Sequence, residues 1–440
     1  MTPPPQATPA AGAPPLRTVL FVAYHYPPMR SPGVERSARF THYLPEFGYQ
    51  PRVVGTGAFG KPKDGVIRAW EPLGLYRRLF NPAARHRGAA ATRTRTRGPL
   101  AGLSAGARRW LLVPDGQITW VPWAALAALR WVRRHGAELI YTTSPPASAH
   151  LLGGLLKAQT GLPWIADFRD AWLYDPLEPA LLEMPFRREL ERRLEEGVMA
   201  EADAVISATG TAADDFVRRY PAEAAKVRVI TNGFDPADGE AAQAGADPEG
   251  APVSGRLSLV HTGSFAYSHP GRSIEPLERV LRRLVDTEPA WCDRLEVILV
   301  GELSPEEQEL VSALAELGVV RLTGAVDRAT ALAFQRRADV LLLVDHPRPW
   351  PASNAPGKLF EYLAAGKPIL ALCGEGETRR TVEELDAGLC AAPGDTDAIE
   401  AALRRLWAGS LPRAETGLER FHRRELTRRL AECFDEVLGA

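Results

Sequence analysis

The second half of the sequence places two cations at the starts of predicted helices, where the helix itself disfavours positive charge. Lys358 lies in the first turn of a helix that Pro356 and Gly357 open, and Arg272 precedes a helix predicted from Ser273. The positive end of a helix dipole repels a cation, whereas cations and free N–H groups together bind phosphate. One diphosphate ligand would explain both cations; an exposed Arg272 with no role is the alternative.

Glu361 follows Lys358 by three residues in the same predicted helix. Its carboxylate could accept hydrogen bonds from the hydroxyl groups of a ribose that accompanies the diphosphate. The alternative is a simple ion pair between Lys358 and Glu361, which would stabilise the helix by about 0.2–0.5 kcal/mol.

Two segments of the first half also place candidate residues where predicted strands end. Gly33 lies in a turn just before a helix, so the backbone there could approach a ligand closely. An ordinary loop between a strand and a helix is the alternative, because the dinucleotide fingerprint G-x-G-x-x-G is absent. Further along, Asp167, Arg169 and Asp170 follow one another in ADFRDAW (166–172). Three charges at a strand end indicate either structural ion pairs or a site.

Strands and helices alternate along the chain, which is typical of parallel sheets covered by helices on both faces. We predict strands at 18–24, 138–144, 164–168, 203–209, 226–233, 256–263, 294–301, 319–324, 339–345, 368–374 and 389–392. A helix is expected at 34–47, and others lie between the later strands. Ligands of open parallel sheets bind beyond the carboxyl ends of the strands, where the candidate residues stand.

The sequence therefore predicts an α/β fold of two Rossmann-like parallel-sheet lobes with a cleft between them. A segment almost without large apolar residues separates the two series of strands. We expect a disordered leader at 1–16, a first lobe at 17–235, a linker at 236–254, a second lobe at 255–410, and a C-terminal helix at 411–440 that packs back toward the first lobe.

The composition excludes several classes of protein. Across 440 residues, 53 Lys and Arg oppose 54 Asp and Glu, so a globally basic nucleic-acid binder is not expected. The four cysteines lie far apart without C-x-x-C spacing, which argues against a disulfide scaffold or a zinc site and fits a reducing cytosol. The most apolar stretch, 118–129, is too short to cross a bilayer.

Charge is nevertheless unevenly distributed. Residues 1–240 hold 30 basic and 23 acidic side chains, whereas residues 241–440 hold 23 and 31. Within the first lobe, 66–135 carries 13 Arg against two acids, Glu71 and Asp115, together with several Trp residues. This pattern indicates docking on an anionic membrane face or binding of a lipid-diphosphate acceptor. A solvated Arg-rich surface is the alternative.

These segments together resemble the family-4 retaining glycosyltransferases, which have the two-lobed GT-B architecture. The resemblance runs from VLFVAYHYPPMRSPGVERS through YTTSPPASAHLLG, IADFRDAW and VITNGFD, and continues through LVHTGSF, VILVG and GKLFEYLAAGKPILAL. It implies transfer of a sugar from a nucleotide-diphosphate donor with retained anomeric configuration and no required metal or other cofactor. The first lobe would then bind the acceptor, and the second lobe the donor.

The resemblance also implies roles for individual residues. Arg272 and Lys358 match basic residues that neutralise the leaving diphosphate, and Glu361 matches the second Glu of the family's E-x7-E motif, which binds ribose. ADFRDAW lies where many members carry a catalytic His-Asp pair, so its charged residues are candidates as well. The predicted catalytic residues are thus Arg272, Lys358, Asp167, Arg169 and Asp170, and the predicted donor-binding residues are Gly33, Gly263, Ser264, Glu361, Ser353, Asn354 and Gly357.

The sequence departs from the family pattern at two positions. Ser353 stands where E-x7-E would place its first Glu, and Arg169 is nearest the position of the expected His. We expect a cytoplasmic enzyme of surface-polysaccharide synthesis, peripheral on the inner face of the plasma membrane, with a glycan or lipid-linked acceptor. A sugar-nucleotide hydrolase or epimerase and a non-catalytic sugar-nucleotide-binding protein are the alternatives.

Overall fold

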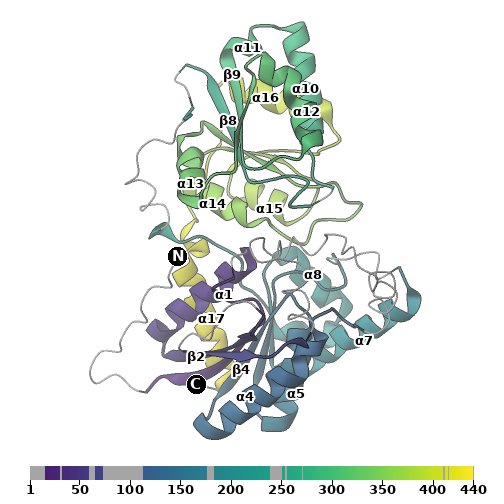
Figure 1. Cartoon of the computed structure of the whole chain (residues 1–440), viewed down its shortest axis with the longest axis vertical. Helices are drawn as coiled ribbons and strands as arrows, with labels where there is room; N and C mark the ends of the chain where they lie inside the picture. The colour runs from purple at the N-terminus through teal and green to yellow at the C-terminus, as the bar shows by residue number, and fades with distance from the viewer. Residues whose placement is uncertain are drawn as a thin grey trace. The chain divides into compact units, whose positions relative to one another are not determined.

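The computed structural model divides the chain into two compact units (Figure 1). Unit 1 comprises Met1–Asn232 together with Arg423–Ala440, and unit 2 comprises Gly233–His422. The structure describes residues 15–29, 32–58, 65–72, 112–175, 183–237, 250–252, 255–269, 271–409, 412–414 and 416–439. Most of the expected leader and linker, and most of the Arg-rich segment, lie outside the described residues.

Unit 1 is built on a parallel sheet with strand order β3-β2-β1-β4-β5-β6-β7 among the described residues. The strands are β1 (Arg17–Ala23), β2 (Tyr49–Thr56), β3 (Val66–Ala69), β4 (Leu139–Ser144), β5 (Trp164–Phe168), β6 (Ala204–Ser207) and β7 (Val227–Val229). The helices are α1 (Pro32–Tyr43), α4 (Val121–His135), α5 (Ser148–Thr160), α7 (Pro185–Glu201), α8 (Gly210–Arg219) and α17 (Arg423–Leu438).

The run TVLFVAY of β1 shows why this sheet is buried on both faces. Leu20 and Val22 point into a core shared with α4, α5, α7 and α8, whereas Val19 and Phe21 point into a second core shared with α1 and α17. Successive strand residues alternate between faces, so a strand without polar alternation has to be covered on both sides. The apolar runs that predicted strands are therefore the runs that the helices enclose.

Helix α17 completes unit 1 although it is distant in sequence (Figure 1). It lies beside α1, and its fully buried Phe434 packs edge-on against Tyr49, with ring centroids 5.1 Å apart. Arg424 also forms an ion pair with Glu46 at 2.6 Å. The C-terminal helix thus belongs to the core of the first lobe, while the preceding residues up to His422 belong to unit 2.

Unit 2 contains a parallel sheet with order β10-β9-β8-β11-β12-β13 within the described ranges. Its strands are β8 (Leu257–Thr262), β9 (Leu295–Val300), β10 (Val320–Gly324), β11 (Val340–Val344), β12 (Ile369–Leu372) and β13 (Gly388–Ala391). The helices of four or more residues are α10 (Glu275–Thr287), α11 (Trp291–Arg294), α12 (Pro305–Glu316), α13 (Arg328–Arg337), α14 (Gly357–Ala365), α15 (Glu377–Glu384) and α16 (Thr396–Trp407).

The helices of unit 2 divide between the two faces of its sheet. Side chains of α10, α12 and α16 pack in one core, and side chains of α13, α14 and α15 pack in the other. Strand order reverses between β8 and β11, as it does between β1 and β4 in unit 1. Loops that leave neighbouring strands at such a point diverge to opposite faces, and ligands bind there. Gly33 lies in the first turn of α1, directly after such a loop, and Arg272 lies in the loop that follows β8.

The structure corrects several predicted boundaries. The strand predicted at 226–233 is only Val227–Val229, and the helix predicted at 34–47 ends at Tyr43, followed by a 3₁₀ turn that contains Pro45. Proline has no N–H for the helix ladder, so a change of geometry there is expected. The helix predicted from Ser273 begins at Glu275. Strands β2 and β3 were not predicted. No helix in the described ranges combines the length and apolar character needed to cross a bilayer.

Candidate functional site

Gly263 marks the carboxyl end of β8, where the candidate site of unit 2 begins. Its φ of +101° lies in the left-handed region, which glycine adopts without strain. A Cβ atom at this position would lie 3.2 Å from Nζ of Lys358, so a side chain would crowd that ammonium group. Glycine therefore serves two purposes here, the turn of the chain and the close approach of Lys358.

Lys358 reaches this position from the first turn of α14. The helix is anchored by Leu359, Phe360 and Leu363, which are buried beneath it. Burial lowers the pKa of Lys358 to about 7, with the positive charge of Arg272 contributing in the same direction. A cation held in this way is destabilised until an anion arrives, which is the behaviour expected of a phosphate-binding group.

Arg272 approaches from the loop between β8 and α10. Its Nη2 lies 3.4 Å from Oδ1 of Asp345, which directly follows β11, and Arg348 Nη1 lies 3.0 Å from Oδ2 of the same carboxylate. Burial alone would raise the pKa of Asp345, but a hydrogen bond from His346 and the charges of Arg348 and Arg272 hold it well below its usual range. Asp345 is therefore ionised, and its carboxylate orients the guanidinium group of Arg272.

Glu361 is held by α13 and forms no ion pair with Lys358 in the described part of the chain. Arg328 Nη1 lies 3.0 Å from Glu361 Oε1, and Gln335 Nε2 donates to Oε2 at 3.3 Å. Gln335 also donates to Oγ1 of Thr262 at 2.9 Å, which links Glu361 to the end of β8. The alternative of an i,i+3 pair with Lys358 is thus not what the structure contains.

The other predicted donor-binding residues of unit 2 lie along two loops. Ser353 is buried, and the neighbouring Asn354 accepts a hydrogen bond from Arg348 Nη2 at 3.2 Å. Gly357 is the first residue of α14, next to Lys358. Ser264 follows Gly263, and its Oγ lies 2.8 Å from Oγ of Ser268. Gly263, Arg272 and Lys358 are therefore brought together, with Ser264 and Gly357 adjacent to them in sequence.

In unit 1 the predicted acid Asp167 is enclosed by donors. Two bonds join it to Arg36, Nε to Oδ2 at 3.1 Å and Nη2 to Oδ1 at 2.8 Å, and both side chains are almost fully buried. Tyr141 Oη and Thr143 Oγ1 donate to Oδ2 at 2.6 and 2.9 Å. Burial alone would raise the pKa of Asp167, but Arg36 and these hydrogen bonds hold it below its ordinary value. Asp167 is thus an ionised group that joins α1 to the sheet.

The guanidinium group of Arg169 donates hydrogen bonds to three backbone carbonyl groups. Its Nε donates to O of Ser144 at 2.7 Å, and its Nη2 donates to O of Pro145 at 2.8 Å. Its Nη1 donates to O of Gly33 and fills the space that a Cβ atom at Gly33 would need. Arg169 therefore requires glycine at position 33, and it ties the first turn of α1 to the end of β4 and the residue after it.

Asp170 differs from its two charged neighbours in ADFRDAW. The residue as a whole is partly exposed, and its carboxylate makes no hydrogen bond or ion pair within the described ranges. Burial raises the pKa of Asp170 in spite of the opposing charge of Arg169. The structure thus separates the three predicted residues: Asp167 and Arg169 are engaged by protein atoms, and Asp170 retains a carboxylate that could accept a substrate proton or hydroxyl.

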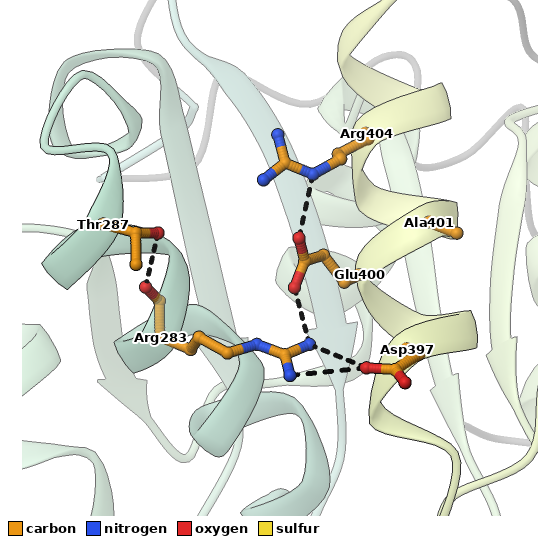
Figure 2. Close-up of a pocket in the computed structure, with 6 residues that line it drawn as sticks. All are labelled: Arg283, Thr287, Asp397, Glu400, Ala401 and Arg404. Carbon is orange, nitrogen blue, oxygen red and sulfur yellow. Dashed lines mark hydrogen bonds and ion pairs between the residues drawn. The ribbon is translucent and has the colours of Figure 1, made fainter.

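A surface hollow of about 440 Å³ in unit 2 is a different feature (Figure 2). Its charged lining residues neutralise one another, because Arg283 and Arg404 each lie within 3 Å of Glu400, at 2.6 and 2.9 Å. It lies between α10 and α16, whereas Lys358 belongs to α14 on the opposite face of the sheet. Exposed ion pairs of this kind contribute little to the stability of the fold. None of the predicted site residues lines the hollow.

Two family models match the sequence of the units described above. The model Glycosyltransferase Family 4 matches residues 33–238, and Glycosyl transferases group 1 matches residues 257–409. The chain belongs to the family-4 glycosyltransferases. This is a retaining family with the GT-B fold, which agrees with the two parallel sheets observed.

The chain spans about half the length of the curated relatives it matches. D-inositol 3-phosphate glycosyltransferase of Salinispora tropica is 28% identical over 262 residues, which cover 54% of this chain and 50% of that protein. The enzyme of the same name from Streptomyces avermitilis is 32% identical over 192 residues, covering 40% and 38%. Glycogen synthase of Mycobacterium tuberculosis is 25% identical over 215 residues, covering 48% and 47%.

Solved structures share the fold over nearly the whole chain. Sucrose-phosphate synthase from Thermosynechococcus elongatus aligns with a TM-score of 0.64 and 16% identity, covering 96% of this chain and 99% of that chain. Anabaena HepE in complex with UDP gives a TM-score of 0.58 and 16% identity, covering 96% and 100%. At these identities the likeness concerns architecture alone.

Several residues that hold the candidate residues of each unit in place were not predicted. His261 contacts Lys358, Asp345 holds Arg272, and Arg36 holds Asp167. Arg36 follows Gly33 by three residues, and Asp345 ends the apolar run DVLLLVD, so both lay inside segments already recognised. Their partners are distant in sequence, however, and only the fold brings them together. In the described ranges no cluster of three or more His, Cys, Asp or Glu side chains could hold a metal ion.

The ion pair of unit 1 leads to a stability prediction. Asp167→Asn leaves the buried guanidinium of Arg36 uncompensated, and we expect the free energy of unfolding at pH 7 to fall by about 3–5 kcal/mol. Urea denaturation followed by circular dichroism measures this, with exposed Asp286→Asn as the matched control. Because the pKa of Asp167 is lower in the folded protein than in the unfolded chain, its contribution to the free energy of unfolding of the wild type is fully present above pH ~4. This contribution is lost as the pH falls further. Equal stability of the two variants would contradict this role.

Proposed function

We propose that the chain transfers a glycosyl group, with retention, from a nucleotide-diphosphate sugar to a hydroxyl group of a glycan or lipid-linked acceptor. The observation that carries this proposal is the convergence of Lys358 and Arg272 beside Gly263 at the carboxyl ends of β8 and β11. Membership of a retaining glycosyltransferase family supports the reaction class. The enzymes named among the relatives are glycosyltransferases and synthases, which supports it further.

The chemical demand of this reaction is separation of charge. As the bond between C1 of the sugar and the diphosphate oxygen breaks, positive charge develops on the sugar and negative charge on the leaving group. Preorganised cations stabilise that negative charge best where water is scarce. Lys358 and Arg272 would do so, while the acceptor oxygen bonds to C1 from the same face and its proton passes to the leaving phosphate.

The remaining residues indicate how the donor would be oriented. Glu361, fixed by Arg328 and Gln335, would accept hydrogen bonds from the ribose hydroxyls. Ser353 offers a hydroxyl where the family pattern has a carboxylate, so its contact with the sugar would be uncharged. Two structural neighbours, Anabaena HepE and Staphylococcus aureus MnaA, were each solved with UDP, which makes UDP-sugars the first donors to test.

A nucleotide-release assay over a panel of UDP-, GDP- and ADP-sugars tests the proposal. We expect release with one class of donor to depend on an added glycan or lipid-linked acceptor, and the product to keep the anomeric configuration of the donor. Release that needs no acceptor would instead indicate the hydrolase, and a changed sugar without release would indicate the epimerase. Donor binding without any turnover would indicate the non-catalytic protein.

The two cations give a prediction about rate. We expect Lys358→Ala and Arg272→Ala each to lower turnover by about 10²–10³, the loss that follows removal of one preorganised donor to developing negative charge. Steady-state kinetics with the active donor measures this, and Arg279→Ala, at an exposed arginine of α10, is the matched control. Undiminished turnover in both variants would remove these residues from the mechanism.

We also propose that helix α4 docks this enzyme on an anionic membrane surface. Trp123, Leu126, Arg130 and Arg133 recur at spacings that place them on one side of α4, and all four are exposed. Trp70 packs against Trp123, with ring centroids 4.7 Å apart, so two exposed indoles stand together. Arg130, Arg133 and Arg134 form no ion pair within the described residues. Exposed indoles beside unpaired guanidinium groups suit the headgroup region of an anionic bilayer.

Liposome co-sedimentation at low salt tests this surface. We expect binding to vesicles that contain an anionic phospholipid and about tenfold weaker binding when Trp123→Ala and Arg130→Glu are combined, since apolar insertion and charge attraction are both lost. Phe186→Ala, at an exposed aromatic residue of α7, should bind like the wild type. Equal binding to neutral and anionic vesicles, or none at all, would contradict the proposal.

A further inference from the structure

His261 is a fully buried histidine near the end of β8, and its imidazole has a defined tautomer. Its Nδ1 lies 2.9 Å from O of Leu342 in β11. A carbonyl oxygen can only accept a hydrogen bond, so Nδ1 carries the proton. In a neutral imidazole Nε2 then holds a lone pair.

That lone pair faces the ammonium group of Lys358. The distance from Lys358 Nζ to His261 Nε2 is 3.2 Å, and because lysine has donors only, Nζ donates and Nε2 accepts. Burial lowers the pKa of His261 well below its ordinary value, and the charge of Lys358 lowers it further. His261 is consequently neutral, which is the only state in which it can receive this hydrogen bond.

The imidazole is fixed on its other sides as well. Phe265 stacks on it, with ring centroids 4.2 Å apart and an interplanar angle of 17°. Tyr362 Oη lies 3.3 Å from O of Leu342 and receives a hydrogen bond from N of Thr262 at 3.0 Å. The carbonyl group of Leu342 and the ring of Phe265 therefore hold the imidazole, and Tyr362 of α14 holds that carbonyl group in turn, so the position of Nε2 is set by the core of unit 2.

We infer that His261 is a positioning residue, whose neutral Nε2 holds Nζ of Lys358 in place beside Gly263. One N–H of the ammonium group is used in this contact, and two remain for phosphate oxygens. The inference deepens the proposed function and rests on it, because the diphosphate of the donor is the anion that Lys358 would meet. A freely rotating lysine would have to be ordered at each binding event, whereas this one is ordered beforehand.

The charges around Lys358 should also make the binding of a nucleoside diphosphate depend on pH. Besides neutral His261 on β8, the groups that act on it are Arg272 from the following loop, Asp345 after β11 and Glu361 on α14. Burial and the charge of Arg272 lower the pKa of Lys358, and the two carboxylates raise it, so that it comes to about 7. A diphosphate favours the charged form, so binding takes up a proton above pH 7. Affinity for a nucleoside diphosphate should therefore fall by up to about tenfold per pH unit as the pH rises through this range.

Isothermal titration of the full chain with UDP tests the inference, over about pH 6 to 9 and in buffers of different ionisation enthalpy. GDP and ADP are substituted if the donor panel identifies another base. We expect His261→Phe to weaken binding by about tenfold or more, as for loss of a hydrogen bond to a charged group. We also expect it to move the midpoint of the pH dependence to lower pH, because the ammonium form has lost an acceptor.

Two further variants separate positioning from folding. His261→Gln keeps an amide oxygen that can accept from Nζ, so it should restore part of the affinity and of the pH midpoint. His150→Phe, at a second fully buried histidine in unit 1, should leave binding and its midpoint unchanged. In a Lys358→Ala background, His261→Phe should have no further effect, since a residue that acts through Lys358 has nothing left to position.

The outcomes distinguish this inference from the function on which it rests. Additive losses from His261→Phe and Lys358→Ala, or an unmoved pH midpoint, would overturn the positioning role while leaving the diphosphate site intact. If Lys358→Ala binds as well as the wild type, the proposed donor site fails. Absence of binding to any of the three nucleoside diphosphates would reject both.

Discussion

Cations that bind a diphosphate have to be kept close together before the diphosphate is present. Their mutual repulsion and their partial loss of hydration oppose such an arrangement. Unit 2 reduces both effects with groups that its sheet already positions. Asp345 offsets the charge of Arg272, and neutral His261 gives Lys358 a hydrogen bond without adding charge. These groups do not fully offset the loss of hydration and the repulsion from Arg272, so the pKa of Lys358 stays below its ordinary value. The proposed donor diphosphate would neutralise the remaining positive charge of the two cations.

Unit 1 uses arginine in another way, as a connector between segments distant in sequence. Arg36 binds Asp167 and also donates to backbone carbonyl groups of Ile230 and Thr231, at 2.8 and 2.6 Å. Arg169 donates to the carbonyl groups of Gly33 in α1, Ser144 at the end of β4 and Pro145 directly after it. A planar guanidinium with five donors suits this purpose, because it satisfies several buried oxygens in fixed directions. The first turn of α1 and the end of β4 are thereby joined, and the carboxylate of Asp170 makes no hydrogen bond or ion pair within the described ranges.

The sequence predicted the fold well where local pattern decides it. Buried runs such as TVLFVAY and DVLLLVD predicted strands because a parallel sheet requires apolar residues on both faces. Strand β2 was not predicted because Pro51 and Arg52 interrupt its apolar character. Strand β3 was not predicted because it is only four residues long. Gly263, Arg272 and Lys358 were recognisable from their positions at strand and helix ends. His261 and Asp345 were not, since their roles depend on contacts 97 and 73 residues away, which no local spacing encodes.

The return of α17 to unit 1 makes unit 2 an insertion within another folding domain. The two ends of that insertion meet, because N of Phe234 donates to O of Phe421 at 3.0 Å. During synthesis unit 2 can therefore close while unit 1 still lacks the helix that covers one face of its sheet. Until α17 has been synthesised, Val19, Phe21 and Tyr141 lack part of their cover, and exposed apolar surface of this kind favours aggregation of folding intermediates. Unit 1 can therefore complete its packing only after all of unit 2 has been synthesised.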